Sequence, residues 1–461
     1  MKRTPCDNLP DPAALAGRLA ASGLSKPAAE EKAGLFHRCL GMLNSMSGPR
    51  GEVHALFVPG RIEVLGKHTD YAGGRSLLAA AERGFCVVAR ARDDNHVRIA
   101  PVDQEAVEFA ISPDLEPAIG AWSNYPMTVA RRLARNFPAF LRGADVAFAS
   151  DLPPAAGMGS SSALVVASFL VLSGFNDLHK LDEYRDNIAS REDLAGYLGT
   201  IENGQSFRGL AGDRGVGTFG GSEDHTAMLC CLPDRLVQYA FCPVRRERNI
   251  EFPSALSLAI GCSGLRAEKT GSAMEDYNRA SALASAALRA WNEATGRGDP
   301  SLAAALASDA EAFQRVKETL RSRQLKPFGP AELIGRLEQF HTESNEIIPA
   351  AADALARGDM PEFGRVVDLS QELAERLLGN QVPNTIMLAR SAKELGAAAA
   401  SAFGAGFGGA VWAMVAVEES EVFLARWARR YREDFTELAG QSSFFLTRPG
   451  PAALSATELA W

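Results

Sequence analysis

Apolar residues change their spacing several times along the chain, and each change predicts a different kind of element. In the first fifty residues, single leucines stand among polar residues, a spacing typical of helices. From Val53 to about Ala110 the apolar residues gather in short runs, which predicts strands, most clearly at Phe85–Ala91 and Val97–Pro101. Helical spacing returns from Met127 to Arg142.

The pattern that follows alternates strand, glycine-rich turn and helix. The predicted strand Asp145–Ala149 leads into a turn rich in glycine and serine, and the apolar run Ala163–Leu172 is a predicted helix. A second unit begins near residue 250 with the predicted strand Ser257–Gly261 and continues in long alanine-rich helices. It ends with a predicted helix from Ala389 to Phe403, a glycine-rich loop, and a predicted strand from Ala410 to Val417.

Length and composition predict a soluble protein of two domains. Single cores stop growing at about 250–300 residues, so a chain of 461 residues is expected to form two domains, residues 1–250 and 251–461. The 46% hydrophobic and 23% charged content is typical of globular proteins. A net charge of −8 gives no basic surface that would favour binding to nucleic acid or to an anionic membrane.

The cysteines and the ends of the chain indicate a reduced, cytoplasmic protein. The seven cysteines show no paired spacing, and no Cys-x-x-Cys or His-Glu-x-x-His pattern indicates a zinc site. The first residues are polar and broken by proline, unlike the apolar centre of a signal peptide. No run reaches the roughly 18 apolar residues that a membrane-spanning helix needs.

The segment Pro59–Gly74 concentrates more polar and ionisable side chains than the other segments. It brings cations, a histidine, a carboxylate and a phenol between glycine turns, directly after an apolar strand. Loops that a rigid scaffold holds carry much of a protein's chemistry, so this segment predicts a polar pocket, although an ordinary charged loop would look similar. Gly60–His68 only partly matches a Walker loop, because five residues separate its glycines and His68 follows the lysine.

The segment Gly157–Ser162 predicts an anion site. A strand, a glycine turn and three serines at the start of a helix would present free N–H groups and the positive end of the helix dipole. Serine hydroxyls can donate to phosphate or ligate Mg²⁺. The alternative interpretation is a serine N-cap on a core helix.

Two later segments add a glycine loop and a pair of carboxylates. Gly404, Gly406 and Gly409 match Gly-x-Gly-x-x-Gly, but a dinucleotide site needs a strand before the loop and a helix after it, and the predicted order here is the reverse. After a glycine-rich stretch, Glu223 and Asp224 make Asp224 a candidate acid or base. Asp224 could equally be a turn residue or helix cap unless a cation lies beside it, and Arg61 is the candidate.

Taken together, these segments resemble the GHMP sugar and metabolite kinases, and within them the galactokinase branch. The three glycine-rich segments resemble the three motifs of that branch, and the ordered matches run from about residue 53 to residue 414. Lesser matches lie beside the adenine pocket, at a metal-binding glutamate, at the loop with the catalytic aspartate and at a sugar-contacting tyrosine: Trp122–Tyr125, Glu202, Gly221–Asp224 and Glu275–Arg279.

The resemblance implies an α+β fold and an active site between two domains. The N-terminal domain would have a left-handed βαβ unit and the C-terminal domain would be ferredoxin-like. The implied reaction is ATP-dependent phosphorylation of a sugar hydroxyl, for galactose the anomeric one. The expected ligands are ATP, Mg²⁺ and a small-molecule sugar, and we expect a monomer or weak homo-oligomer.

The same resemblance assigns roles to individual residues. Asp224 would accept or orient the hydroxyl proton, and Arg61 would hold it ionised, because an opposite charge within about 4–6 Å lowers the pKa of a carboxyl. Ser161 and Glu202 would hold Mg²⁺. The expected sugar-binding residues are Lys67, His68, Asp70, Gly221 and Tyr277. The expected ATP-binding residues are Trp122, Gly157, Met158, Gly159, Ser160, Ser161, Ser162 and Gly406.

Several positions depart from the galactokinase pattern. Lys67 replaces a glutamate that accepts a hydrogen bond from the hydroxyl at carbon six, so an anionic sugar such as galacturonate is an alternative substrate. Lys67 could instead turn away from the sugar. Ser162 replaces the usual alanine and Thr128 a glycine, and Gly204–Gln205 is an apparent insertion. A non-catalytic regulator that binds sugar and ATP is a further alternative, whereas His68–Tyr71 argues against a kinase of mevalonate, homoserine or inositol.

Overall fold

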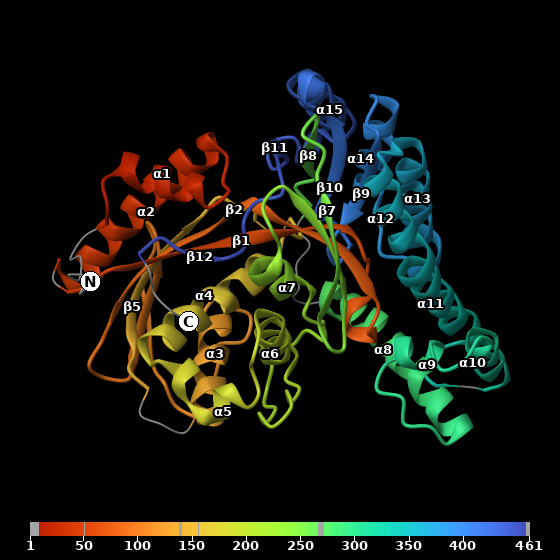
Figure 1. The fold of residues 1–461 in the computed structure, drawn as a ribbon, viewed down its shortest axis with the longest axis horizontal. Coiled ribbons are helices and arrows are strands. Elements are labelled where there is room, and N and C mark those ends of the chain that lie inside the picture. The colour runs from red at the N-terminus through yellow and green to blue at the C-terminus, as the bar shows by residue number, and fades with distance from the viewer. Residues whose placement is uncertain are drawn as a thin grey trace.

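The structure, a computed structural model, describes residues 9–49, 51–137, 141–154, 156–265, 272–323 and 325–457. Two β-sheets lie near the centre of the molecule, with helices packed on them and a helical arm at one side (Figure 1). The mixed α+β architecture with two sheets agrees with the predicted fold class.

The larger sheet has eight strands among the described residues. Its strand order is β12-β1-β2-β5-β3-β4, with β6 and β7 joined at β2, and all pairs except β3 with β5 are antiparallel. The bounds are β1 (His54–Leu65), β2 (Arg75–Ala91), β3 (His96–Pro101), β4 (Val107–Ala110), β5 (Ala144–Ser150), β6 (Arg235–Ala240), β7 (Arg245–Glu251) and β12 (Leu454–Ser455).

The first motif begins on a strand and not on a loop. Strand β1 continues through Arg61 to Leu65, with a register irregularity between Pro59 and Arg61, and pairs with β2 on both sides of it. A Cβ at Gly60 would lie 2.6 Å from Leu152 Cδ2 and 3.0 Å from the carbonyl oxygen of Met158, so the glycine lets both lie close to the strand. Arg61 is therefore held by the sheet, which is stiffer than the loop that the sequence suggested.

The smaller sheet has the order β11-β8-β10-β9, all antiparallel. Its strands are β8 (Leu256–Cys262), β9 (Ala399–Phe403), β10 (Ala410–Ala416) and β11 (Ser443–Thr447). The predicted helix Ala389–Phe403 is wrong in its second half, because helix α14 (Pro383–Glu394) ends near Gly396 and Ala399–Phe403 is strand β9. Alanine favours helices, but here small side chains let the sheet pack closely against α14 and α15, and packing overrides propensity.

Helices cover both faces of the larger sheet (Figure 1). The predicted N-terminal helices are α1 (Pro12–Ala21) and α2 (Lys26–Ser47), and α2 packs on β2 and β5. On the opposite face lie α3 (Asn124–Asn136), α4 (Ser160–Phe175), α6 (Arg191–Asn203) and α7 (Glu223–Cys230). A buried ion pair of 2.5 Å between Lys32 on α2 and Asp151 after β5 ties the N-terminal helices to the start of the second motif.

The remaining helices lie at the right and top of Figure 1. Helices α8 (Ser272–Thr295), α9 (Leu302–Leu306), α10 (Ala312–Ser322) and α11 (Pro330–Thr342) belong to the arm, and α12 (Ile348–Arg357) packs on β2 and β7. Helices α13 (Met360–Leu373) and α15 (Ser420–Asp434) pack on the smaller sheet together with α14, and short α5 (Asp182–Arg185) lies elsewhere. Short turns of other helix types are η1 (Asp70–Ala72), η2 (Leu178–Lys180), η3 (Glu343–Ile347), η4 (Ala374–Leu378), η5 (Val417–Glu419) and η6 (Thr436–Leu438).

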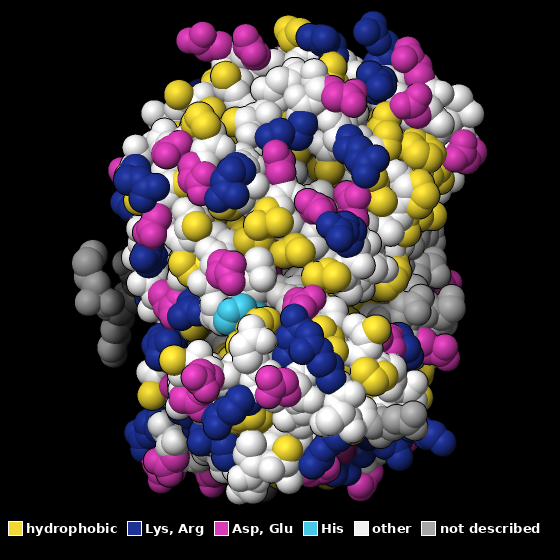
Figure 2. Space-filling model, turned by 90° about the vertical axis from the view of Figure 1, so that its right-hand side faces the viewer, with side chains coloured by type: hydrophobic (Ala, Val, Ile, Leu, Met, Phe, Trp, Pro, Cys, Tyr) yellow, Lys and Arg dark blue, Asp and Glu magenta, His cyan; other side chains and the backbone are white. Residues whose placement is uncertain are grey.

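On the face that Figure 2 shows, basic and acidic side chains are interspersed and neither sign gathers in one area. Within the described part of the chain, none of the helices combines the length and the apolar content needed to cross a bilayer. Strand β12 returns to the larger sheet beside β1, while the domain boundary near residue 250 stays a prediction.

Candidate active site

A cavity of about 730 Å³ lies where the larger sheet, helices α4, α6 and α7, and the loop between β9 and β10 meet. Most of the residues predicted to bind ligands line it. They are Arg61, His68, Asp70, Trp122, Gly157, Gly159, Ser160, Ser161, Ser162, Glu202, Gly221, Asp224 and Tyr277.

The three glycine-rich segments converge at this cavity, as the sequence predicted. Arg61 of the first segment donates from Nη1 to the carbonyl of Gly157 in the second, at 3.0 Å. The Gly404 amide of the third donates to Glu63 Oε2 in the first, at 3.2 Å. Gly404 has a φ of 82° and a Cβ there would lie 2.8 Å from the Gly157 oxygen, so this approach requires glycine.

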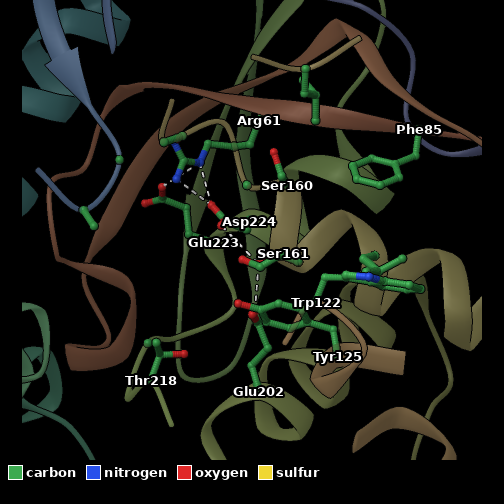
Figure 3. Close-up of a pocket in the computed structure, with 18 of the residues that line it drawn as sticks. Arg61, Phe85, Trp122, Tyr125, Ser160, Ser161, Glu202, Thr218, Glu223 and Asp224 are labelled. Atoms are coloured by element: carbon green, nitrogen blue, oxygen red, sulfur yellow. Dashed lines mark hydrogen bonds and ion pairs between the residues drawn. The ribbon is translucent and has the colours of Figure 1, made fainter. Parts of the chain in front are cut away.

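Arg61, which is buried, and Asp224, which is partly buried, form an ion pair that lines the cavity (Figure 3). Both Nε and Nη2 of Arg61 lie 2.6 Å from Asp224 Oδ1, and Arg61 is 5% exposed. Burial alone would lower the pKa of Arg61, but the charges of Asp224, Glu223 and Glu63 outweigh it and raise the pKa, so the guanidinium stays charged. Helix α7 begins at Glu223, and its N-terminal dipole favours a carboxylate at Asp224.

Serine hydroxyls and a second carboxylate lie beside Asp224. Ser162 Oγ lies 2.7 Å from Glu202 Oε2 and 3.2 Å from Asp224 Oδ2. Gly159 lets helix α4 come this close, since a Cβ there would lie 3.1 Å from Asp224 Oδ2. Figure 3 shows Ser160, Ser161 and Glu202 along the same side of the cavity. Ser162, where the galactokinase pattern has alanine, is thus the serine whose hydroxyl reaches both carboxylates.

The oxygen donors of this corner fit a hard cation that also binds phosphate. A hydroxyl has one proton, so Ser162 cannot fully satisfy both Glu202 and Asp224. Carboxylate and hydroxyl oxygens suit Mg²⁺, which proteins usually hold through one or two carboxylates together with substrate phosphates. Among the described residues there is no group of three or more histidine, cysteine, aspartate or glutamate side chains that could hold a metal by itself. A cation here would therefore need further ligands, for which waters and phosphate oxygens are suited.

The other end of the cavity is aromatic. The ring centroids of Trp122 and Phe148 lie 5.5 Å apart, edge to face, and those of Phe85 and Phe148 lie 5.6 Å apart. Figure 3 shows Phe85 and Trp122 on the side away from Arg61, and Tyr125 between Trp122 and Glu202. Flat apolar walls of this kind suit a planar ring. The sequence indicated Trp122 and Tyr125 but not Phe85 and Phe148, because these two lie in strands where core residues look the same.

The predicted sugar-binding residues form the wall beside Asp224. His68 Nε2 lies 2.9 Å from the carbonyl of Ala405 and its Nδ1 lies 3.1 Å from the hydroxyl of Tyr71. Asp70 Oδ2 accepts from the amide of Glu223 at 3.0 Å, and burial raises the pKa of Asp70. A Cβ on Gly221 would lie 2.4 Å from Asp70 Oδ2, so the glycine lets these two segments touch.

Lys67, Met158 and Gly406 do not line the cavity. Lys67 is 1% exposed and donates to the hydroxyls of Ser370 at 3.1 Å and Ser401 at 2.8 Å, in the direction of the smaller sheet. The sugar contact of Lys67 stays a prediction, and its hydrogen bonds to Ser370 and Ser401 favour the alternative in which Lys67 turns away from the sugar.

The other two positions act through their backbones. The carbonyl of Met158 accepts from the amide of Arg61 at 2.9 Å, so its role is to hold strand β1 against the second motif. Gly406 packs on Asn380, where a Cβ would lie 2.2 Å from the Asn380 oxygen. Gly404 and Ala405 are the residues of the third segment that line the cavity.

One helix of the C-terminal half holds the loop that carries His68. Arg336 on α11 donates to the carbonyl of His68 at 2.5 Å and to the hydroxyl of Tyr71 at 3.1 Å. From the same helix, Gln339 donates to the carbonyl of Lys67 at 3.2 Å, and Glu343, the first residue of η3, which follows α11 directly, accepts from the amide of Gly66 at 2.9 Å. These residues stand far from any recognisable motif, so no pattern in the sequence indicated them.

Comparison with known proteins identifies related families for three parts of the chain. Residues 124–210 match the GHMP kinases N-terminal domain, residues 351–433 the GHMP kinases C-terminal domain, and residues 47–91 the galactokinase galactose-binding signature. The galactokinase of Chloroflexus aggregans is 29% identical over 384 residues, which cover 81% of this chain and 86% of that protein.

Solved structures share the fold. The Lactococcus lactis galactokinase complexed with galactose superposes with a TM-score of 0.73 at 23% identity, over 90% of this chain and 98% of that one. The Methanococcus jannaschii mevalonate kinase gives a TM-score of 0.53 at 14% identity, over 87% of this chain and 99% of that one.

Proposed function

The chain belongs to the GHMP kinase superfamily and is galactokinase-like within it, and from this premise we propose that it transfers the γ-phosphoryl group of ATP to the anomeric hydroxyl of galactose or a related hexose. The observation that carries the proposal is the contact between Arg61 and Asp224, which lies in a cavity with the phosphate-loop serines on one side and the predicted sugar residues on the other.

Asp224 is the group that accepts or orients the proton of the attacking hydroxyl. Arg61 occupies Oδ1 of Asp224, so Oδ2 is the oxygen that can face the sugar. The guanidinium keeps the carboxylate ionised and in one orientation, as a general base requires. Phosphoryl transfer needs little covalent help from the protein, so this positioning supplies much of the catalysis.

The nucleotide would lie along the opposite part of the cavity. The backbone N–H groups at the start of α4, after Gly159, suit the phosphates, and the aromatic end at Trp122 suits the adenine ring. Glu202 and Ser161 or Ser162 would hold Mg²⁺, which when bound neutralises charge on the phosphates. The sugar would lie against His68, Asp70, Gly221 and Tyr277, which share the cavity with Asp224.

The experiment is an ADP-release assay across a panel of sugars with the purified chain. We expect turnover with galactose or a close hexose, and none above background for the Asp224→Asn variant. The panel includes galacturonate, and binding of each sugar is measured in parallel by calorimetry. Binding of sugar and ATP without turnover would identify a sensor and overturn the proposal.

A further inference from the structure

Two buried carboxyl groups next to the proposed catalytic pair have no part in the chemistry described so far. Glu63 on β1 is 3% exposed and Glu223 at the start of α7 is 7% exposed, and both line the cavity. Glu223 Oε1 lies 3.5 Å from Arg61 Nε, the same nitrogen that contacts Asp224. Arg61 is therefore shared between two adjacent carboxyl groups of α7.

The contacts of Glu63 and Glu223 indicate that ionising both carboxyl groups at once is energetically unfavourable. Ser76 donates to Glu223 Oε2 at 2.6 Å, and the Gly404 amide donates to Glu63 Oε2 at 3.2 Å. Glu63 Oε1 is buried and receives no hydrogen bond from a donor group among the described residues. The side chain of Glu223 interacts directly with that of Glu63, and two carboxyl groups can share a hydrogen bond only when one of them carries a proton.

The charged groups around the pair favour a retained proton. The carboxyl groups that face it are Asp70 on η1, Asp224 on α7 and Glu343 on η3, and the cations are Arg61 on β1 and Lys67 in the following loop. Tyr277 on α8 adds a phenol whose pKa burial raises well above its usual range, so it brings no charge. With Glu63 and Glu223, five carboxyl groups face two cations in a buried volume, and nearby buried carboxylates lower this repulsion by binding a proton.

Burial shifts the pKa values of both carboxyl groups in the direction that favours a bound proton. Burial raises the pKa of Glu63 to about 7, and the positive charges of Arg61 and Lys67 only partly oppose it. Burial and the charge of Glu63 raise the pKa of Glu223 well above its ordinary value. Such a pair titrates as a unit, so the proton belongs to both side chains.

We propose that Glu63 and Glu223 share one proton and act together as a positioning pair that leaves Arg61 committed to Asp224. With the proton in place, Glu63 and Glu223 together carry one negative charge, and the ion pair of Arg61 with Asp224 is stronger than the contact of Arg61 with Glu223. Without it, Glu223 competes for Arg61 Nε, and repulsion between Glu63 and Glu223 strains the contact from Glu63 to Gly404 across the cavity. The inference rests on the proposed kinase function.

The first test is the pH dependence of kcat/KM for wild type, Glu63→Gln and Glu223→Gln between pH 5.5 and 9.5. Glutamine imitates the protonated carboxyl, since its amide can donate to the remaining partner. We expect wild-type kcat/KM to fall on the alkaline side as the pair loses its proton, and each variant to lose that fall or move it by at least one pH unit. An alkaline limb at the wild-type pH in both variants would overturn the proposal.

The control is Glu82→Gln, which changes a buried carboxyl group outside the cavity. Glu82 accepts from the amides of Ser25 and Arg448 and touches neither Arg61 nor Glu223. We expect it to keep the wild-type pH profile. An equal shift in this variant would mean that the limb reports general stability, and the proposal would be wrong.

The second test does not depend on turnover and separates this inference from the proposed function. The ordinary pKa of a glutamate is 4.5 and that of Glu63 in the folded chain is about 7, so the folded state binds the proton more tightly. The stabilisation of the folded state by this bound proton is complete below pH 4.5 and is lost as the pH rises through about 7. Between pH 5 and 8, wild-type Tm should therefore fall further than the Tm of Glu63→Gln. Parallel Tm curves would overturn the shared proton even if the chain phosphorylates galactose.

Discussion

Arg61 contacts Asp224 through a single carboxylate oxygen, and this leaves the other oxygen directed to the serines of the phosphate loop. Nε and Nη2 of Arg61 both lie 2.6 Å from Oδ1, whereas Oδ2 lies 3.2 Å from Ser162 Oγ. The two oxygens thus have separate tasks. One is fixed by the guanidinium of strand β1, and the other faces the junction between the proposed sugar and phosphate sites.

Replacing Asp224 by asparagine should remove turnover without unfolding the chain. Asparagine keeps the shape of the side chain, and Arg61 retains Glu223 as an anionic neighbour, so the fold should persist. The amide cannot act as a base, and we expect kcat to fall by about 10²–10⁴-fold. Steady-state ADP release gives kcat, and a circular dichroism melt checks the fold. Wild-type kcat in a folded variant would exclude Asp224 as the base.

The Ser162→Ala variant tests which serine side chain helps to bind the Mg²⁺ ion. Ser162 is the serine whose hydroxyl contacts both Glu202 and Asp224, at 2.7 and 3.2 Å. If it orients Glu202, its loss should raise the Mg²⁺ concentration for half-maximal rate by about tenfold, the lower end of the effect of groups that orient metal ligands. Ser161→Ala is the matched comparison at the neighbouring position. A larger shift in Ser161→Ala would return the metal role to the residue that the family resemblance indicated.

The sequence predicted that the three glycine-rich segments meet at one cavity, but it did not indicate all the residues that line or support that cavity. The three glycine segments and Arg61 carry patterns that are rare in ordinary loops and strands, and the structure brings them together. Strand β9 was predicted as a helix, because alanine favours helices and only tertiary packing makes Ala399–Phe403 a strand. Phe85, Phe148 and Arg336 could not be found, since a cavity-lining aromatic in a strand and a buried arginine on a helix look like ordinary residues until distant elements meet.

Lys67→Met should leave the choice of sugar unchanged and lower stability. The ammonium donates to Ser370 and Ser401 in the core, outside the cavity, so it cannot select an anionic sugar directly. Removing two buried hydrogen bonds and one cation beside Glu63 should lower the free energy of unfolding by about 1–3 kcal/mol. The ratio of kcat/KM for galactose to that for galacturonate, with urea unfolding, checks both parts. A ratio that moves tenfold toward or away from galacturonate would show that Lys67 does reach the sugar.

Arg336→Lys should weaken sugar binding while ATP binding stays the same. Arg336 donates to the carbonyl of His68 and the hydroxyl of Tyr71 with the two-pronged geometry of a guanidinium, which lysine cannot reproduce. The loop at His68 would lose its fixed position, so we expect KM for the sugar to rise by about tenfold or more, equivalent to roughly 1.4 kcal/mol of lost binding. KM for ATP should change less than twofold, because Arg336 contacts none of the residues near Trp122 or Ser161.

The matched control for this split is Arg315→Lys, an exposed arginine on α10 that pairs with Asp309. It removes a guanidinium from the same helical arm without touching the loop at His68, so both KM values should stay at wild type. If Arg336→Lys raised the two KM values equally, its effect would be a general loosening of the interface between α11 and the first motif. A rise confined to the sugar would instead mean that a helix of the C-terminal half sets the geometry of the sugar wall.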